Sequence, residues 1–397
     1  MKKKDFWKGF CCAGALILVV TLVWRTSLIQ QWIPWEYLPF DIHMSSVAKT
    51  NLIEDFLDKY YVDEYDKEMA NEGMYAGMMA GVGDRYTYYM SADNLREYLQ
   101  NNNGHFEGIG VKVYQTESGE VIVYELMDGY PAQRVGILEG DIIQEIDGVD
   151  VSGSTIDDVA QKMRGPVGTM VEVGVFRPSD GQMHLFKIER EDVVMESVNG
   201  RMLEGKNGYI HITGFKENTY EQFMEVLADL QSQGMEKLIL DLRNNPGGLV
   251  RSVYQIGNEL LPQGVMVYTE DKVGNREELV CDDQYLDIPM VVLVNGNSAS
   301  ASEIFAGAAT DMKVATLVGT NTFGKGLVQR LFTLPDGSAL NITIQKYFTP
   351  NGTSIHGTGI TPDIVVELPT EYADLDEIPE GEDTQLIEGI RILDEKN

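Results

Sequence analysis

The segment VNGNSASASEIFAGAATD, residues 294–311, decides the fold together with VGTNTFGKGLVQ, residues 318–329. The apolar residues that lead into the first segment predict a buried strand, and Asn295-Gly296-Asn297 predicts a sharp turn at its end. Apolar residues then recur at helical spacing, which predicts a helix. Ser300 is therefore expected at a strand–turn–helix junction, where unpaired backbone N–H groups can stabilise the oxyanion of an acyl-transfer reaction.

Ser300 has two interpretations on this local pattern. It can act as a nucleophile, or it can cap the helix, because Ser300-Ala301-Ser302-Glu303 matches the S-x-x-E capping box. Most serines in such a box only cap the helix. The local pattern leaves both interpretations open.

The second segment places Lys325 in a glycine-flanked loop, between an apolar strand and a run that alternates like a strand. A lysine in an apolar pocket can accept the proton of a serine hydroxyl, because desolvation disfavours its charged form. Phe323 and Leu327 are predicted to form that pocket. Gln329 lies an even number of residues from Lys325 and is expected on the same face, where its amide can orient the amine. The alternative for Lys325 is a solvated loop lysine.

Composition argues against several other chemistries. The chain has 397 residues with 31 basic and 62 acidic side chains, and the resulting charge of −31 disfavours a nucleic-acid partner. Gly319 to Lys325 nearly spells a phosphate-binding loop, but Gly326 stands where a magnesium-binding Ser or Thr is required. Cys281 has no partner after the N-terminal region, and the five scattered histidines form no H-E-x-x-H motif. No metal, nucleotide or other cofactor is therefore expected.

Residues 1–28 are predicted to be a cytoplasmic flank and a transmembrane anchor. Four lysines precede an apolar run from Gly9 to Trp24, and Arg25 closes the run. A cleaved signal peptide is the alternative, although no A-x-A-like cleavage site follows. The lysines on the N-terminal flank predict a cytoplasmic start, with everything after Arg25 in the cell envelope or exterior.

Residues 45–103 are predicted to form a helical region. Leu52, Phe56 and Tyr60 recur at a spacing of four, and a stripe of methionines with alanines follows. A methionine stripe at helical spacing is more often core than a ligand site. The methionines are therefore predicted to be buried.

Residues 104–191 are predicted to form a domain of short strands with one helix over 155–163. The segment GYPAQRVGILEGDIIQEIDGVDV resembles a PDZ domain, and FEGIGV at 106–111 resembles the loop that binds a peptide's terminal carboxylate. Glycine-permitted N–H groups can form a nest for that carboxylate while the peptide adds as a strand, and apolar neighbours favour an apolar last residue. The alternative is a plain glycine hairpin. The residues predicted to bind the peptide are Gly108, Ile109, Gly110, Val111, Val159, Met163 and Arg164.

Residues 192–368 are predicted to form a layered α/β core, because strand-like runs alternate with helical ones. DLRNNPGG, residues 241–248, ends one of these strands in a glycine turn. Backbone N–H groups at this turn can complete an oxyanion hole with the N–H of Ala301. Residues 369–397 are predicted to be an acidic tail that ends in an amphipathic helix.

Three separated segments, SASASEIFAGA, FGKGLVQ and DLRNNPGGLV, closely resemble the carboxy-terminal processing proteases, also called tail-specific proteases. The spacing between Ser300 and Lys325 in the sequence also resembles the spacing between the serine and the lysine of this family. The resemblance implies a ClpP/crotonase-like core with Ser300 as nucleophile, Lys325 as general base and Gln329 positioning the lysine. It also implies an oxyanion donor at Gly247 or Gly248, of which Gly247 is favoured.

The resemblance extends to other parts of the chain. GDRYTYYMS, residues 83–91, resembles the junction after the family's N-terminal helices, which contribute to dimer contacts in relatives, so a homodimer is an expectation. Arg164 resembles an arginine that couples peptide binding to opening of the active site in some relatives, and a solvated arginine at a helix end is the alternative. Asp311 matches an acidic position near the family's site, and a structural role at the end of a helix suits it equally.

The sequence thus predicts a membrane-anchored Ser–Lys endopeptidase whose PDZ domain binds the C-terminal tail of a protein substrate. A PDZ scaffold with a catalytically silent core is the main alternative, although Ser300, Lys325 and Gln329 are all present. Acyl transfer on a coenzyme A thioester, as in the crotonases, is a further alternative.

Overall fold

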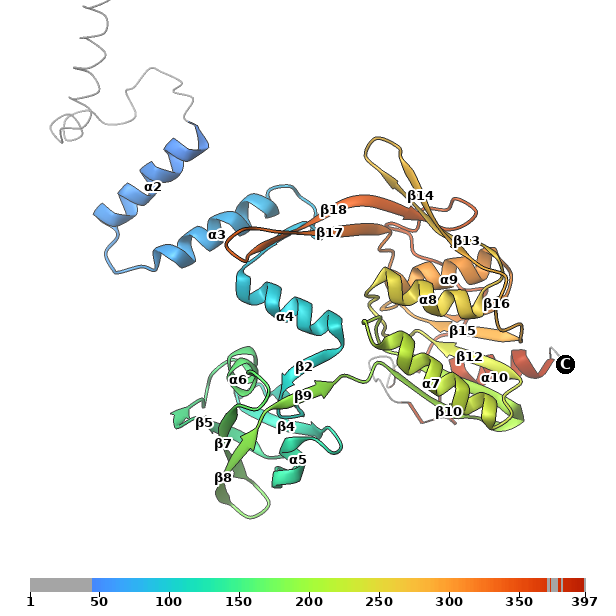
Figure 1. Ribbon diagram of the computed structural model, residues 1–397, viewed down its shortest axis with the longest axis horizontal. Coiled ribbons are helices and arrows are strands. Elements are labelled where there is room, and N and C mark those ends of the chain that lie inside the picture. The colour runs from blue at the N-terminus through green and yellow to red at the C-terminus, as the bar shows by residue number, and fades with distance from the viewer. Residues whose placement is uncertain (1–44, 370–371, 373–377, 380, 396–397) are drawn as a thin grey trace, which may run out of the picture. The chain divides into compact units, whose positions relative to one another are not determined.

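The computed structural model describes residues 45–369, 372, 378–379 and 381–395 (Figure 1). The predicted anchor at 1–28 lies outside these residues, so it stays a prediction. No helix among the described residues is both long enough and apolar enough to cross a membrane.

The described chain begins with two helices in the region predicted to be helical. Helix α2 spans Ser46–Tyr60, and helix α3 spans Lys67–Ala80. Ser45 caps α2, because its Oγ accepts a hydrogen bond from the N–H of Ala48. Strand β1 (Tyr88–Met90) and helix α4 (Ala92–Asn103) follow.

The PDZ-like segment forms a sheet with its own hydrophobic core. The sheet has the order β3-β4-β5-β7-β8, with β6 paired to β5, and every pairing is antiparallel. Val159, Val173 and Ile188 are fully buried in its core. A ribbon of β2 and β9 precedes and follows this sheet in the chain. The elements are β2 (His105–Gly108), β3 (Val111–Gln115), β4 (Val121–Leu126), α5 (Pro131–Val135), β5 (Ile142–Ile146), β6 (Val149–Asp150), α6 (Ile156–Met163), β7 (Met170–Arg177), β8 (Gln182–Glu189) and β9 (Glu191–Val194).

The larger domain is built on a mostly parallel sheet. Its strand order is β10-β11-β12-β15-β16-β19, and only β10 pairs antiparallel. Strands β12 (Lys237–Asp241) and β15 (Met290–Val294) are buried along their whole length, as expected where both faces of a parallel sheet are covered. The remaining elements are β10 (Val198–Met202), a 3₁₀ turn (Glu204–Lys206), β11 (Asn207–Ile212), β16 (Ala315–Gly319) and β19 (Ile364–Val365).

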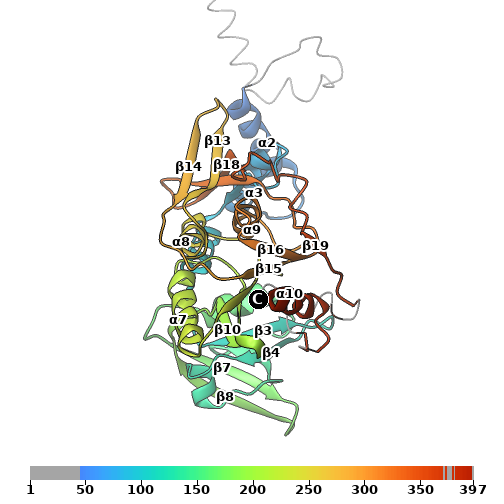
Figure 2. The same cartoon turned by 90° about the vertical axis from the view of Figure 1, so that its right-hand side faces the viewer.

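Helices cover both faces of this sheet (Figures 1 and 2). Leu240 and Val292 pack with helices α7, α8 and α9, whereas Ile239 and Val291 pack with α10 on the opposite face. This alternation confirms the predicted mixed α/β organisation. The helices are α7 (Thr219–Ser232), α8 (Val250–Leu260), α9 (Ala301–Asp311) and α10 (Thr384–Glu395).

A second sheet brings distant parts of the chain to the same place. Its long strand β18 (Ala339–Phe348) pairs with β1, β13 and β17. Strand β17, which follows Lys325, and strand β1 are therefore both paired with β18. Its other strands are β13 (Gly264–Asp271), β14 (Arg276–Cys281) and β17 (Leu327–Thr333).

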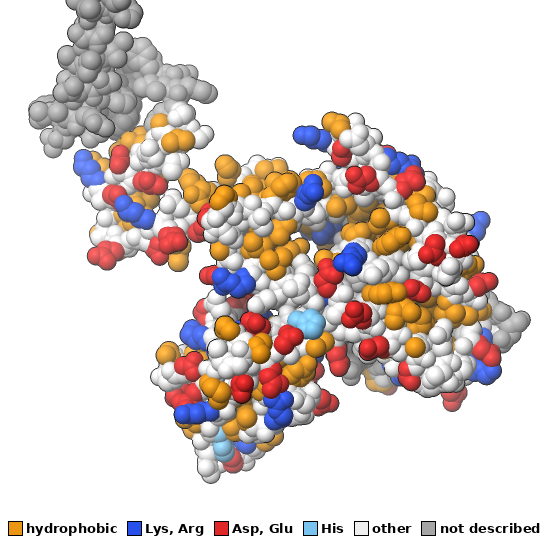
Figure 3. All heavy atoms as spheres, viewed as in Figure 1, with side chains coloured by type: hydrophobic (Ala, Val, Ile, Leu, Met, Phe, Trp, Pro, Cys, Tyr) orange, Lys and Arg blue, Asp and Glu red, His pale blue; other side chains and the backbone are white. Residues whose placement is uncertain are grey.

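The prediction that the methionine stripe is buried is wrong. Met69, Met74 and Met78 expose 72%, 40% and 69% of their surfaces, and hydrophobic side chains gather over α3 (Figure 3). Helices α2 and α3 contain no buried residue. An apolar stripe marks a face that can pack, but it does not say that the same chain covers that face.

Candidate active site

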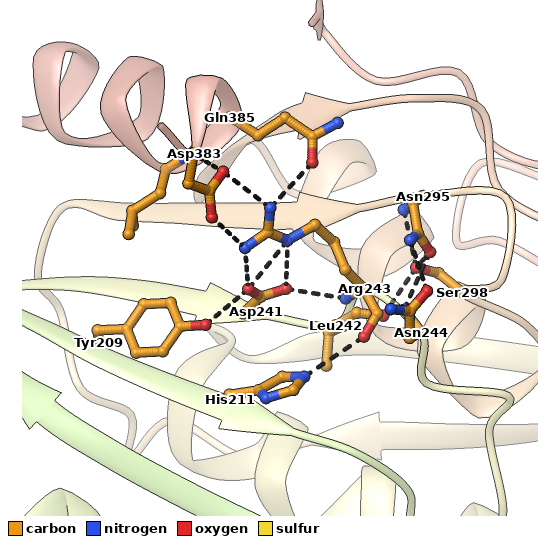
Figure 4. A network of polar contacts seen from close by, with 11 residues as sticks. Tyr209, His211, Asp241, Leu242, Arg243, Asn244, Asn295, Ser298, Asp383 and Gln385 are labelled. Carbon is orange, nitrogen blue, oxygen red and sulfur yellow. Dashed lines mark hydrogen bonds and ion pairs between the residues drawn. The ribbon is translucent and has the colours of Figure 1, made fainter. Parts of the chain in front are cut away.

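Ser300 lies between strand β15 and helix α9, at the junction predicted from the sequence. Its backbone has φ 56° and ψ −110°, a strained conformation for a residue with a side chain. Such strain persists only where neighbouring contacts hold it. The Ser300 oxygen accepts from the N–H groups of Glu303 and Ile304 at 2.9 and 3.0 Å. Two residues earlier, the Ser298 Oγ joins the turn to the end of β12: it donates to the Leu242 oxygen at 2.7 Å and accepts from the Asn295 N–H at 2.9 Å (Figure 4).

The glycine turn after β12 packs directly against Ser300. Gly247 has φ 102°, and a Cβ added to it would lie 2.8 Å from the Ser300 Cβ and 3.0 Å from the Ala301 nitrogen. Only glycine permits this approach. The Gly247 N–H donates to Asn245 Oδ1 at 2.9 Å, whereas the Ala301 N–H makes no hydrogen bond within the described residues. The two predicted oxyanion donors are adjacent, and the Ala301 N–H is the one that has no hydrogen-bond acceptor among the described residues.

A buried ion network holds the start of this turn (Figure 4). The Arg243 guanidinium donates to Asp241 and also to Asp383, at 2.9 and 2.8 Å, just before helix α10. Tyr209 donates to the same Asp241 carboxylate at 2.8 Å. Burial tends to raise the pKa of Asp241, but the charge and hydrogen bonds of Arg243 outweigh it and keep the pKa below its usual range. The C-terminal helix is thereby fastened to the strand that carries the glycine turn.

Lys325 is half-buried in the loop between β16 and β17. Burial lowers the pKa of its amine, the positive charge of Arg85 lowers it further, and the charges of Glu303 and Asp84 oppose the shift. The Lys325 Nζ lies over the Tyr86 ring, 4.8 Å from its centre.

The apolar pocket predicted around Lys325 is only partly formed. Leu327 is buried, but Phe323 is 46% exposed, and the Arg85 guanidinium lies over its ring, 5.1 Å from the centre. Tyr86 takes the place expected of Phe323 beside the amine. Residues 84–86 thus belong to the surroundings of Lys325, although the sequence indicated only a junction between domains there.

Glu303 connects the two loops that carry Ser300 and Lys325. Its carboxylate is fully buried. Oε2 accepts hydrogen bonds from the backbone N–H groups of Ser300 and Lys325, each at 2.8 Å. Oε1 accepts from Thr322 Oγ1 at 2.6 Å and from the Gly324 N–H at 2.7 Å. The sequence identified Glu303 only as half of a capping box; its place in an alanine-rich helix with no other charge before Asp311 was the available signal.

Replacing Glu303 by glutamine is expected to lower both stability and activity. The amide would direct an N–H donor at groups that are themselves donors, so at least one buried N–H loses its acceptor. We expect a loss of about 2–3 kcal/mol in the free energy of unfolding. Loosening of the two loops is expected to reduce kcat by about 100-fold. Denaturant titration and peptide cleavage measure the two effects.

The control for this variant is Glu388→Gln, on the C-terminal helix. Glu388 pairs with Arg391, which is half-exposed at the surface. Loss of such a pair is expected to change stability by less than about 1 kcal/mol and to leave kcat unchanged. A Glu303→Gln enzyme with the kcat of the unmodified chain would show that the shared carboxylate does not hold the site.

Gln329 is not hydrogen-bonded to Lys325. Its Nε2 donates to Thr343 Oγ1 at 3.2 Å, and Thr343 Oγ1 donates to Asp84 Oδ2 at 2.6 Å. The even spacing from Lys325 does not put the two side chains in contact, because β17 begins only at Leu327 and Lys325 lies in the loop before it.

The PDZ domain contains a cavity of ≈ 570 Å³ along β3 and α6. The predicted peptide-binding residues that line it are Gly108, Ile109, Gly110, Val111, Met163 and Arg164. Val159 does not line it; this side chain is fully buried in the domain core, and Ala160 of the same helix faces the cavity instead. The Arg164 guanidinium donates to Glu97 Oε1 of α4 at 2.9 Å.

Other candidates take structural positions. Burial raises the pKa of the Cys281 thiol to about 11, so it is a poor nucleophile at neutral pH. Asp311 Oδ2 accepts a hydrogen bond from the Asn351 N–H at 2.8 Å, at the end of α9. Within the described part of the chain, no three His, Cys, Asp or Glu side chains gather as a metal site would require.

Known proteins resemble this chain over most of its length. Residues 206–366 match the model of peptidase family S41, and residues 98–175 match that of the PDZ domain. A carboxy-terminal-processing protease of Bartonella bacilliformis is 37% identical over 330 residues, 80% of this chain and 74% of that protein. A probable CtpA-like serine protease of Staphylococcus aureus is 33% identical over 391 residues, 95% of this chain and 78% of that protein.

A solved structure shows the same fold. A putative S41 protease of Bacteroides fragilis superposes with a TM-score of 0.52 at 17% identity, over 85% of this chain and 93% of that one. The sequence matches, rather than this likeness of fold, carry the assignment. By them the chain belongs to peptidase family S41, among the carboxy-terminal processing proteases, and is a serine-type peptidase with a PDZ domain.

Proposed function

We propose that the chain is an endopeptidase in which Ser300 attacks the peptide carbonyl and Lys325 acts as the general base. The observation that carries this proposal is the carboxylate of Glu303, which binds the backbone N–H of both residues at 2.8 Å. The two loops that carry Ser300 and Lys325 are thereby hydrogen-bonded to the same atom, Oε2 of Glu303. The strained backbone of Ser300 and the lowered pKa of Lys325 support the same assignment.

The chemistry follows from the groups at the site. The neutral amine of Lys325 takes the proton of the Ser300 hydroxyl as its Oγ bonds to the carbonyl carbon, and the resulting ammonium gives that proton to the leaving amine. The same amine then deprotonates a water molecule, which hydrolyses the acyl-enzyme ester and restores Ser300. A lowered pKa favours this role, because it raises the fraction of neutral amine at neutral pH.

Backbone N–H groups are proposed to stabilise the oxyanion. The Ala301 N–H is free within the described residues, so it can donate directly. The Gly247 N–H can donate only after its bond to Asn245 opens. Gln329 is retained as the residue that positions Lys325, which requires its amide to turn away from Thr343.

The substrates are proposed to be proteins whose C-terminal tails bind in the PDZ cavity. The nest formed by residues 108–111 can receive a terminal carboxylate, and the tail can add as a strand. Ile156 and Met163 are apolar lining residues, so an apolar last side chain is expected. Lys112 and Arg164 also line the cavity, but they are paired with Glu125 and Glu97, so the backbone N–H groups are the proposed ligands of the carboxylate.

An unfolded reporter protein with a free apolar C-terminus tests this proposal. The purified full chain is expected to cleave it, and amidation of the reporter's terminal carboxyl is expected to raise KM by about 10-fold or more, because buried N–H groups lose a charged acceptor. Met163→Ala is expected to raise KM in the same direction. Met170→Ala, at an exposed position of the same domain that does not line the cavity, is the matched control.

The alternative functions are outcomes of the same experiment. A chain that binds the tail in the PDZ domain but leaves the reporter intact would be a binding scaffold, and the proposal would be wrong. A chain that cleaves the free and amidated reporters with equal KM would be a peptidase that does not read the terminal carboxylate.

A further inference from the structure

Tyr347 contacts the backbone of both proposed catalytic residues. It lies on strand β18, and its side chain is 2% exposed. Its hydroxyl lies 2.9 Å from the carbonyl oxygen of Ser300 and is also hydrogen-bonded to the carbonyl oxygen of Lys325. Because a phenol carries one proton, this hydroxyl donates to the two carbonyls in turn or shares its proton between them.

The hydroxyl and the Glu303 carboxylate hold the same two residues through the two peptide groups that flank each Cα. Glu303 accepts from the N–H groups of Ser300 and Lys325, and Tyr347 donates to their carbonyl oxygens. In each of the two residues, the backbone N–H is therefore hydrogen-bonded to Glu303 and the backbone carbonyl to Tyr347. Helix α9 supplies one of these side chains, and strand β18 of the second sheet supplies the other.

This arrangement matters most for Ser300, whose φ of 56° and ψ of −110° are unfavourable for a residue with a Cβ. A strained peptide relaxes by rotating, and rotation about ψ moves the carbonyl oxygen first. The Ser300 oxygen already accepts hydrogen bonds from the N–H groups of Glu303 and Ile304 in helix α9, at 2.9 and 3.0 Å. The Tyr347 hydroxyl adds a third donor, from strand β18, that opposes that rotation. The direction of the Ser300 side chain depends on the same backbone angles.

We propose that Tyr347 is a positioning residue of the active site, whose hydroxyl fixes the carbonyls of Ser300 and Lys325 and so sets the separation of nucleophile and base. The inference rests on the proposed roles of Ser300 and Lys325. Tyr347 lies on a strand that is paired with β17 in the second sheet, the strand that follows Lys325.

The surroundings of the hydroxyl suit a permanent donor. Burial raises the pKa of Tyr347 well above the ordinary tyrosine value, and the negative charge of Glu303 raises it further. The hydroxyl therefore stays protonated wherever the peptidase can work.

The test compares Tyr347→Phe with Tyr220→Phe in the full chain, using a peptide with a free apolar C-terminus. Tyr220 is the matched control: its hydroxyl donates to Glu259 Oε1 at 2.7 Å, between α7 and α8. Tyr347→Phe is expected to lower kcat by about 10- to 100-fold, with KM within about 2-fold. The rise of kcat/KM with pH is expected to move to higher pH, because a looser loop hydrates the Lys325 amine. Tyr220→Phe is expected to change neither quantity.

Two results would overturn this inference without affecting the proposed function. The first is an unchanged kcat and pH profile in Tyr347→Phe while Ser300→Ala is inactive. The second is a loss of kcat in Tyr347→Phe that disappears when the assay is run well below the midpoint of thermal unfolding. A loss of kcat that persists at such temperatures, with a displaced pH profile, supports it. If Ser300→Ala cleaves as well as the unmodified chain, the proposed function itself is wrong, and the inference falls with it.

Discussion

Replacement of Ser300 by alanine is expected to lower kcat for peptide cleavage by about 10⁴-fold or more, to the level that substrate binding and the oxyanion contacts support without a nucleophile. The Ser300 side chain is small, and the backbone contacts to Glu303 and Tyr347 do not use its hydroxyl. The variant should therefore fold and should bind substrate tails with unchanged affinity. Steady-state cleavage of a peptide and binding of its uncleaved analogue measure the two properties.

The control for this variant is Ser252→Ala in helix α8. Ser252 is buried, and its Oγ has no hydrogen-bond partner within the described residues. Its replacement removes a hydroxyl of the same kind without removing a bond, so kcat and stability should remain as in the unmodified chain. Substantial cleavage by Ser300→Ala would remove this serine from the mechanism.

Replacement of Lys325 by methionine is expected to lower kcat by about 10³-fold or more, because no other group at the site can take the proton from Ser300. Methionine keeps an unbranched side chain of similar length and removes only the amine. The variant is expected to unfold at the same or a higher temperature than the unmodified chain, because the desolvated ammonium is gone. A loss of activity without a loss of stability separates catalysis from folding.

The activity of the unmodified chain is expected to increase with pH. The base must be neutral, and burial together with Arg85 lowers the pKa of Lys325. Activity should therefore rise as the pH rises through that lowered pKa, below the ordinary range of lysine. This rising limb of the pH profile should be absent from the residual activity of Lys325→Met. Lys272→Met, at an exposed hairpin lysine, should keep both kcat and the limb. A limb that survives in Lys325→Met would assign it to another group.

The parts of the fold that depend on local pattern were predictable from the sequence. The apolar run before Asn295 forms strand β15, and the spaced apolar residues after Ser300 form helix α9. The short strands with glycine turns form the PDZ domain. In each case a period of two or of 3.6 in one continuous segment carries the information.

The parts that depend on distant segments were not predictable in this way. Tyr347 reaches Ser300 and Lys325 only because β18 pairs with β17, and Asp84 joins them only because β18 also pairs with β1. Asp383 meets Arg243 for a similar reason, because helix α10 covers the second face of the sheet. Local periodicity indicates neither which strands pair nor which buried carboxylate meets which donor.

The predicted position of Gln329 shows the limit of a periodic argument. Counting by two assumes an unbroken strand from Lys325 onward, but the strand begins at Leu327, and the loop before it does not alternate as a strand does. A contact with Thr343 takes the place of the expected contact with Lys325.

The most direct test of the central claim is to map the acyl-enzyme. A peptide ester is mixed with the full chain, the reaction is quenched in acid within the first turnover, and the modified residue is located by mass spectrometry. The account predicts an acyl group on Ser300, formed far more slowly in Lys325→Met and absent from Ser300→Ala. An acyl group on another residue, or turnover of the ester with Ser300 never modified, would contradict it.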